Sequence, residues 1–128
     1  MQSGAKIFLV VLWLLALSGC SPPPIDVVMN RINGKLVATL SQNWGIIFPN
    51  RKNPCVSDVI ISRTEFTSDQ PVWKIKIKGD VQCLKIASFT VGHTPKGFDQ
   101  LVKLSADLRG DYVLTVNGTG WGKSTIVL

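Results

Sequence analysis

The sequence is poor in the residue types from which most active sites and metal sites are built. Its 128 residues include one histidine, one tyrosine, three cysteines and eight acidic residues. A lone histidine without a Cys-x-x-Cys motif argues against a zinc site. No pair of carboxylates stands out, and no Gly-x-Ser-x-Gly motif accompanies His93. We therefore expect no metal, no cofactor and no enzymatic activity, with His93 a solvated loop residue.

The chain also lacks an apolar run long enough to span a bilayer, which takes about 20 residues. Its longest run is "IFLVVLWLLAL", residues 7–17, and Lys6 is the only charged residue before it. A positive start, a short apolar core and small residues after the core are typical of a signal peptide. The remaining length accommodates a single domain.

The small residues after this core form a motif, Leu17-Ser18-Gly19-Cys20. It resembles the lipobox of bacterial lipoproteins. The resemblance implies that the Cys20 thiol is joined to diacylglycerol and that a signal peptidase cuts between Gly19 and Cys20. Ser21, where an aspartate would favour the inner membrane, implies sorting to the outer membrane. The alternatives are an ordinary cleaved signal peptide or an N-terminal anchor helix.

Three regions follow from this reading. Residues 1–19 are expected to be the lipoprotein signal peptide, and residues 20–24 the lipidated cysteine with a proline-rich spacer. Three consecutive prolines in that spacer favour a short, stiff polyproline stalk. Residues 25–128 are expected to form a β domain at the periplasmic face of the outer membrane.

Assigning Cys20 to the lipid leaves Cys55 and Cys83 as an even pair in an oxidising compartment. We expect a disulfide between them, stabilising the fold by roughly 3 kcal/mol on the chain-entropy estimate. Two buried free thiols are the alternative.

Without residues 1–19 the chain has 13 basic and eight acidic side chains. Three of the lysines, Lys74, Lys76 and Lys78, alternate with apolar residues in "PVWKIKIKG". This period of two places the lysines on one face of a strand. They form either a solvated face that protects a sheet edge or a binding surface for anionic lipid or cell-wall groups. Nucleic acid and nucleotide are not expected partners.

The rest of the mature chain is patterned as β-structure, and Asn33-Gly34 is a strong hairpin signal. One segment, residues 98–108, could hold a helical turn. We predict an all-β fold, an antiparallel sandwich of about seven strands. The expected strands are 25–30, 31–40, 44–48, 55–66, 72–78, 83–91, 111–117 and 122–128.

Residues 108–114, "LRGDYVL", carry the only tyrosine, Tyr112. They resemble the tyrosine corner of immunoglobulin-like and fibronectin type III-like domains. The resemblance implies an immunoglobulin-like sandwich, although the cysteine positions depart from the immunoglobulin pattern. Within the same segment, Arg109-Gly110-Asp111 is expected to be a turn rather than an integrin ligand.

The C-terminal "NGTGWGKSTIVL" contains Gly-Lys-Ser behind further glycines, as phosphate-binding loops do. Such a loop needs a glycine where Asn117 stands, and it must open a helix. Only four strand-forming residues follow Ser124. We therefore expect the glycines to close a hairpin.

Among the tryptophans, Trp73 is predicted to lie in the core and Trp121, in a glycine-rich loop, to be a contact residue. The function expected is a non-enzymatic structural or interaction module of the envelope, with an envelope protein or the cell wall as partner. Two alternatives stay open: a binder of glycan, anionic lipid or lysozyme, and an accessory lipoprotein of a secretion machine.

Overall fold

The structure is a computed structural model that describes residues 21–63 and 70–128. The lipobox residues Leu17 to Cys20 and the last three residues of the strand expected at 55–66 lie outside this range. The described strands are β1 (Ile25–Ile32), β2 (Lys35–Asn43), β3 (Arg51–Lys52), β4 (Cys55–Arg63), β5 (Trp73–Ile77), β6 (Leu84–Lys85), β7 (Ser88–Thr90), β8 (Phe98–Val102), β9 (Asp111–Gly118) and β10 (Gly120–Val127).

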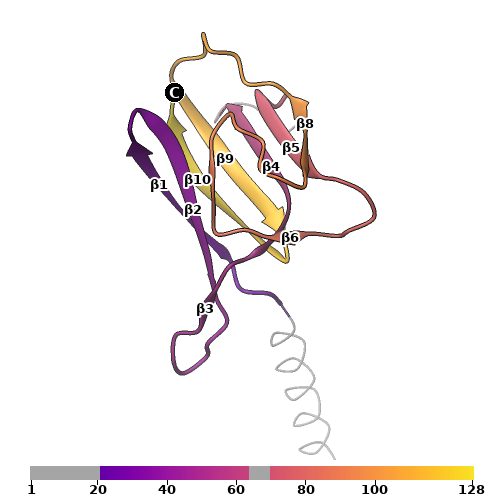
Figure 1. The fold of residues 1–128 in the computed structure, drawn as a ribbon. Helices are drawn as coiled ribbons and strands as arrows, with labels where there is room; N and C mark the ends of the chain where they lie inside the picture. The colour runs from indigo at the N-terminus through magenta and orange to yellow at the C-terminus, as the bar shows by residue number, and fades with distance from the viewer. Residues whose placement is uncertain (1–20, 64–69) are drawn as a thin grey trace, which may run out of the picture.

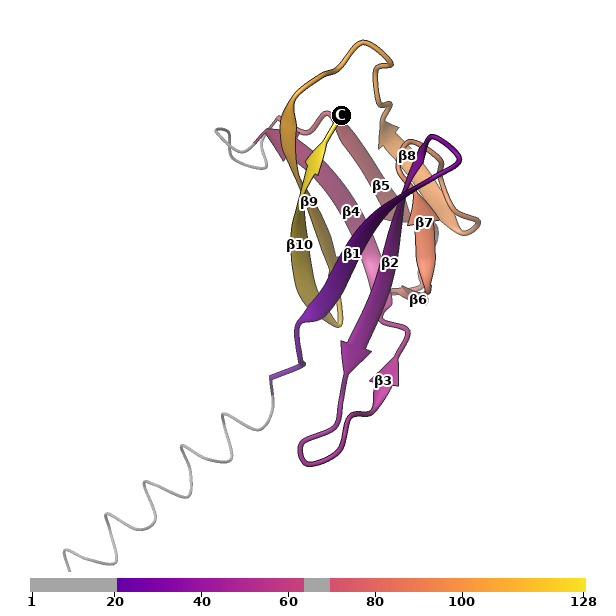
Figure 2. The same cartoon turned by 90° about the vertical axis from the view of Figure 1, so that its left-hand side faces the viewer.

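The strands form two antiparallel sheets that pack face to face (Figures 1 and 2). One sheet has the order β1-β2-β3, with β7 also paired to β2. The other has the order β10-β9-β4-β5-β8, with β6 also paired to β4. Seven of the described strands are five residues or longer. The predicted all-β sandwich of about seven strands is thus confirmed.

The core consists of the inward residues of both sheets. Strand β9, expected as a strand, alternates between inward and outward residues, with Tyr112, Leu114 and Val116 buried. Trp73 is fully buried on β5, as predicted, and its ring centroid lies 6.0 Å from that of Phe89 on the opposite sheet. Its indole Nε1 donates a hydrogen bond to Gln100 Oε1 at 3.0 Å, which satisfies the one polar atom of this large side chain.

A β-bulge in β4 explains an apparent break in its pattern. Val56 and Val59 are both fully buried although three positions separate them. The register with β9 shifts between Val56 and Asp58, so the strand contains one extra residue there. Beyond the bulge, Val59 and Ile61 alternate inward in the ordinary way.

Two local predictions are confirmed. Asn33 and Gly34 have φ angles of 52° and 77° and join β1 to β2 in a two-residue turn. Cys55 and Cys83 form a disulfide with a Cα–Cα distance of 5.2 Å, which is within the usual range. The disulfide joins the first residue of β4 to the chain just before β6.

Residues 98–108, where a helical turn was one option, contain β8 over Phe98–Val102 and then an irregular segment with a turn at residues 105–108. The following element predictions are wrong. Residues 83–91 contain two short strands, because β6 pairs with β4 and β7 with β2, in different sheets. The last strand begins at Gly120, so Trp121 is paired with Asn117 inside the hairpin rather than lying in its loop.

The predicted strand at residues 44–48 is instead an exposed loop. Strand β2 pairs with β1 only as far as Gln42, opposite Ile25. The residues before Ile25 are prolines, which have no N–H to extend the ladder. An apolar, strand-like composition at 44–48 therefore finds no partner strand on that side.

Tyr112 is buried at the start of β9, but its hydroxyl has no hydrogen-bond partner among the described residues. The bond to backbone that the tyrosine-corner resemblance implies is therefore not formed there. The guanidinium of Arg63 lies 5.9 Å from the centre of the tyrosine ring, within range of a cation–π interaction.

Candidate functional site

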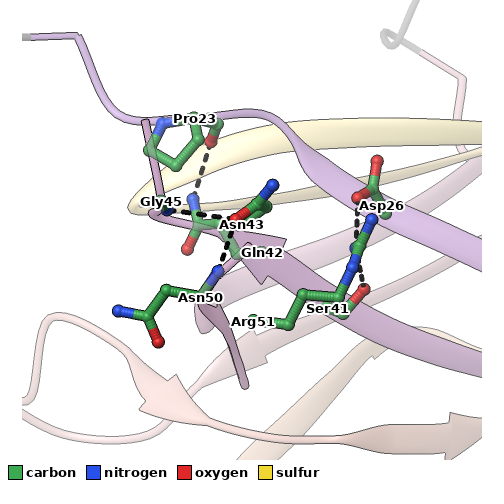
Figure 3. A network of polar contacts seen from close by, with 8 residues as sticks. All are labelled: Pro23, Asp26, Ser41, Gln42, Asn43, Gly45, Asn50 and Arg51. Carbon is green, nitrogen blue, oxygen red and sulfur yellow. Dashed lines mark hydrogen bonds and ion pairs between the residues drawn. The ribbon is translucent and has the colours of Figure 1, made fainter. Parts of the chain in front are cut away.

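The most specific polar arrangement in the sandwich lies at one end, where the chain enters β1. The side chain of Gln42 is 1% exposed, and its Nε2 uses both of its protons. It donates to the carbonyl of Pro23 at 2.7 Å and to that of Thr119 at 2.6 Å (Figure 3 shows the first bond). One buried amide thus ties the N-terminal stalk, residues 21–24, to the turn between β9 and β10.

Glycines of the last hairpin provide the surface on which the stalk lies. A Cβ atom at Gly120, whose φ is 91°, would stand 2.5 Å from the Pro23 carbonyl oxygen and 2.8 Å from Gln42 Nε2. A Cβ at Gly122 would collide with the carbonyl oxygen of Ile25. These glycines were expected only to close a hairpin. They also allow the backbone of residues 23–25 to lie directly against the backbone of β10.

Next to Gln42 begins a second feature, the apolar loop, which we define as residues 44–50. Asn43 closes its neck: its Oδ1 accepts hydrogen bonds from the backbone N–H groups of Gly45 at 3.0 Å and Asn50 at 2.9 Å (Figure 3). The N–H of Trp44 donates to the carbonyl of Asn50 at 2.9 Å. These three bonds hold the loop as a defined projection from β2 and β3.

The tip of the apolar loop is open to solvent. Ile46 is fully exposed, and Ile47 and Phe48 are 85% and 80% exposed. Trp44, at the neck, is 44% exposed. Three consecutive large apolar side chains on a protein surface typically mark an interaction site.

Basic side chains lie beside this loop. Lys52 and Lys85 line a shallow pocket of about 270 Å³ together with Trp44. Neither lysine forms an ion pair with a described residue, whereas the neighbouring Arg51 is paired with Asp26 at 2.8 Å. Arg51 also donates to Ser41 Oγ at 3.0 Å (Figure 3). The pocket therefore has two positive charges that no described acidic residue neutralises.

Trp121, the predicted contact residue, lies at this same end. It is 58% exposed and lines a hollow with the stalk residues Ser21, Pro22 and Pro24. The structure thus brings Trp121 together with the stalk, a relationship that the sequence pattern did not reveal.

The three lysines predicted as a candidate binding surface do not lie at the stalk end of the sandwich but on and just after β5. Lys74 and Lys76 point outward from β5, which is flanked by β4 and β8, so they do not protect a sheet edge. Lys76 is level with Asp58 and Asp99 on the neighbouring strands. Lys78 Nζ lies 3.6 Å from Asp99 Oδ1. This face carries charges of both signs, and two strands, β4 and β9, separate β5 from Trp121 on β10.

The remaining sequence motifs have ordinary structural surroundings. His93 lies exposed in the turn after β7, and its N–H donates to the carbonyl of Thr90 at 3.0 Å. Gly110, with a φ of 111°, lies in a bend, as predicted, and exchanges two backbone hydrogen bonds with Leu128, while Asp111 is the first residue of β9.

Within residues 21–63 and 70–128, no three potential metal ligands gather in one place. Nor does any helix in that part of the chain have the length and hydrophobicity to cross a membrane.

No family model matches the chain, and comparisons with curated proteins and with solved structures find no significant similarity. Any function must therefore be argued from the sequence and from the arrangement just described.

Proposed function

We propose that this chain is a lipid-anchored protein of the bacterial cell envelope. In this proposal it is attached through Cys20 to the periplasmic face of the outer membrane, and its sandwich is a non-enzymatic structural or interaction module. The lipobox resemblance supports the anchor. The observation that carries the proposal is the hydrogen bond from Gln42 to the Pro23 carbonyl, which we call the clamp. Pro23 would be only the fourth residue of the mature chain, so the clamp would hold the domain within three residues of the lipidated cysteine.

A clamped stalk has a consequence for orientation. Cys20 and Pro23 are three residues apart, a length of chain that spans at most about 10 Å. The lipid would therefore hold the stalk end of the sandwich close to the bilayer. The opposite end, with the β1–β2 turn and the C-terminus, would face away from the membrane (Figures 1 and 2).

That far end has features suited to a partner in the envelope. A hollow of about 180 Å³ there is lined by leucines and flanked by two arginines. A hollow lined by leucines and two arginines suits a protein surface that presents an apolar side chain beside a carboxylate. The hollow is lined by Leu36, Leu104, Leu108, Leu128, Arg31 and Arg109.

The resemblance to immunoglobulin-like domains adds an architectural analogy to this proposal. It does not identify a ligand, because the same sandwich carries many unrelated functions. The partner must be found by experiment.

Photocrosslinking in intact cells tests the proposed module. A photoreactive residue replaces Ala106, in the irregular segment beside the hollow, and a control replaces Val28, which is exposed on β1. We expect a discrete protein adduct from position 106 and none from position 28. Adducts with glycan would instead make the chain an envelope ligand binder, and a secretion component as the adduct would make it an accessory of that machine.

The anchor is tested separately by metabolic labelling with a lipid analogue. Cys20→Ala should lose the label, and Ser21→Ala, its neighbour, should keep it. Label that persists in Cys20→Ala would contradict lipidation at this cysteine.

A further inference from the structure

We propose that the stalk end of the sandwich is a membrane-binding surface. The apolar loop inserts into the interfacial region of the bilayer, and Lys52 and Lys85 lie against the phosphates of anionic lipid headgroups. This inference rests on the proposed function for its orientation, since the tether decides which end of the sandwich meets the bilayer.

The position of the loop is the first argument. The clamp residue Gln42 precedes Asn43, the neck of the loop, so the stalk and the loop leave the sandwich from adjacent points. Figures 1 and 2 both show the loop between β2 and β3 projecting from the same end of the sandwich as the stalk. Three extended residues, half of the loop, reach about 10 Å from the sandwich. The chain between Pro23 and Cys20 has the same maximum length, so the loop tip and the lipid can reach the same depth.

The chemistry of the loop is the second argument. From Trp44 to Pro49 it contains no charged or hydrogen-bonding side chain except the indole N–H. Ile46, Ile47 and Phe48 cover nothing in the fold, being fully or largely exposed. Side chains of this kind bury themselves at the boundary between headgroups and acyl chains, and tryptophan is favoured at the headgroup level. Trp44 at the neck and Trp121 beside the stalk occupy that level.

Charge is the third argument, and it selects the kind of lipid. Lys52 and Lys85 share a pocket with Trp44 and make no ion pair with a described residue. Asp26, which lies opposite Ser41 near the base of the loop, is neutralised by Arg51. A lysine near an anionic membrane surface is attracted to it. The loop end thus combines an apolar tip with positive charges that have no ion-pair partner among the described residues, as interfacial anchors do.

The neck bonds of Asn43 favour the same interpretation. They fix the loop before any contact forms, so little conformational freedom is lost when the tip enters the bilayer. A second copy of the chain or another protein could also cover an apolar tip. The sequence places the predicted lipid site three residues before Pro23, and this proximity favours the bilayer.

The test is photocrosslinking from the tip of the loop in proteoliposomes. The full mature chain is purified from membranes and reconstituted into phosphatidylcholine vesicles with and without phosphatidylglycerol. A diazirine side chain replaces Ile47. The matched control replaces Ile32, an isoleucine 53% exposed at the β1–β2 turn, on the opposite end of the sandwich.

We expect lipid adducts from position 47 and only background from position 32. The yield at position 47 should rise with phosphatidylglycerol, and that rise should disappear in the double variant Lys52→Gln/Lys85→Gln. Equal yields at positions 47 and 32 would overturn the inference. So would adducts to a second copy of the chain in place of lipid.

The N-terminal peptide of the same samples, analysed by mass spectrometry, separates this inference from the proposed anchor. Acylated Cys20 without lipid adducts at position 47 would refute the loop insertion and leave the anchor intact. Lipid adducts at position 47 with an unacylated Cys20 would support the insertion and refute the anchor.

Discussion

Gln42 and Pro23 are 19 residues apart, and a hydrogen bond of 2.7 Å from the buried amide of Gln42 to the Pro23 carbonyl joins them. The second proton of the same amide is bonded to Thr119. A stalk that the sequence presents as a free proline spacer is therefore part of the folded domain. Its direction is set by the core of the sandwich, and this direction brings the apolar loop and Trp121 to the end where a lipid is expected.

Replacing Gln42 with alanine should destabilise the domain. The variant leaves the carbonyls of Pro23 and Thr119 without their donor, at a cost of about 2 kcal/mol or more. For a domain of this size we expect Tm to fall by roughly 10 °C in thermal unfolding. Gln82→Ala, at an exposed glutamine, is the control and should leave Tm unchanged. If the two variants have the same Tm, the hydrogen bonds of Gln42 do not stabilise the domain and the clamp is refuted.

Gly120→Ala should be more damaging than an equivalent change at another left-handed glycine. Both Gly120 and Gly79 have positive φ angles, so alanine at either position costs roughly 1–2 kcal/mol of backbone strain. Only at Gly120 does the added Cβ meet the Pro23 carbonyl, and no atom lies within 4 Å of a Cβ at Gly79. In chemical denaturation, Gly120→Ala should lose clearly more free energy of unfolding than Gly79→Ala. Similar losses would mean that the stalk does not lie on Gly120.

The disulfide should stabilise the fold by an amount that increases slowly with the length of the loop that it closes. Cys55 and Cys83 are separated by 28 positions, and the double variant Cys55→Ala/Cys83→Ala should lose about 3 kcal/mol of unfolding free energy. Titration of the unfolded wild-type protein with a thiol reagent should find neither of these two thiols free. Two reactive thiols would contradict the bond.

Tyr112→Phe should leave the stability unchanged or raise it. The buried hydroxyl has no partner among the described residues, so its removal relieves a desolvation cost without breaking a bond found there. The aromatic ring, which packs in the core, is retained. If Tm falls by more than a few degrees, the hydroxyl is hydrogen-bonded after all, as a tyrosine corner would require.

The sequence predicted the parts of this fold that depend on local pattern. Alternation in β5 placed Trp73 in the core, and Asn33-Gly34 placed the first hairpin, because these signals act between near neighbours along the chain. The cysteine pair was found from its even count and expected compartment. None of these signals depends on which strands share a sheet.

The stalk end of the sandwich could not be predicted in the same way. The docking of Pro23 on Gly120 joins residues 97 positions apart in the chain of 128. Residues 44–48 have the composition of a strand, but they lie in the loop that joins the paired strands β2 and β3, and the prolines before β1 offer no ladder to pair with. Trp121 was identified as a contact candidate, but its place beside the stalk depends on the packing of β1 against β10.

The central claim is that the chain is anchored by lipid at Cys20, and mass spectrometry of the N-terminal peptide from native membranes tests it most directly. The account predicts a peptide that begins at Cys20, carries diacylglycerol on the thiol and lacks residues 1–19. An N-terminal peptide that begins at another residue, or one in which the Cys20 thiol is free, would contradict it.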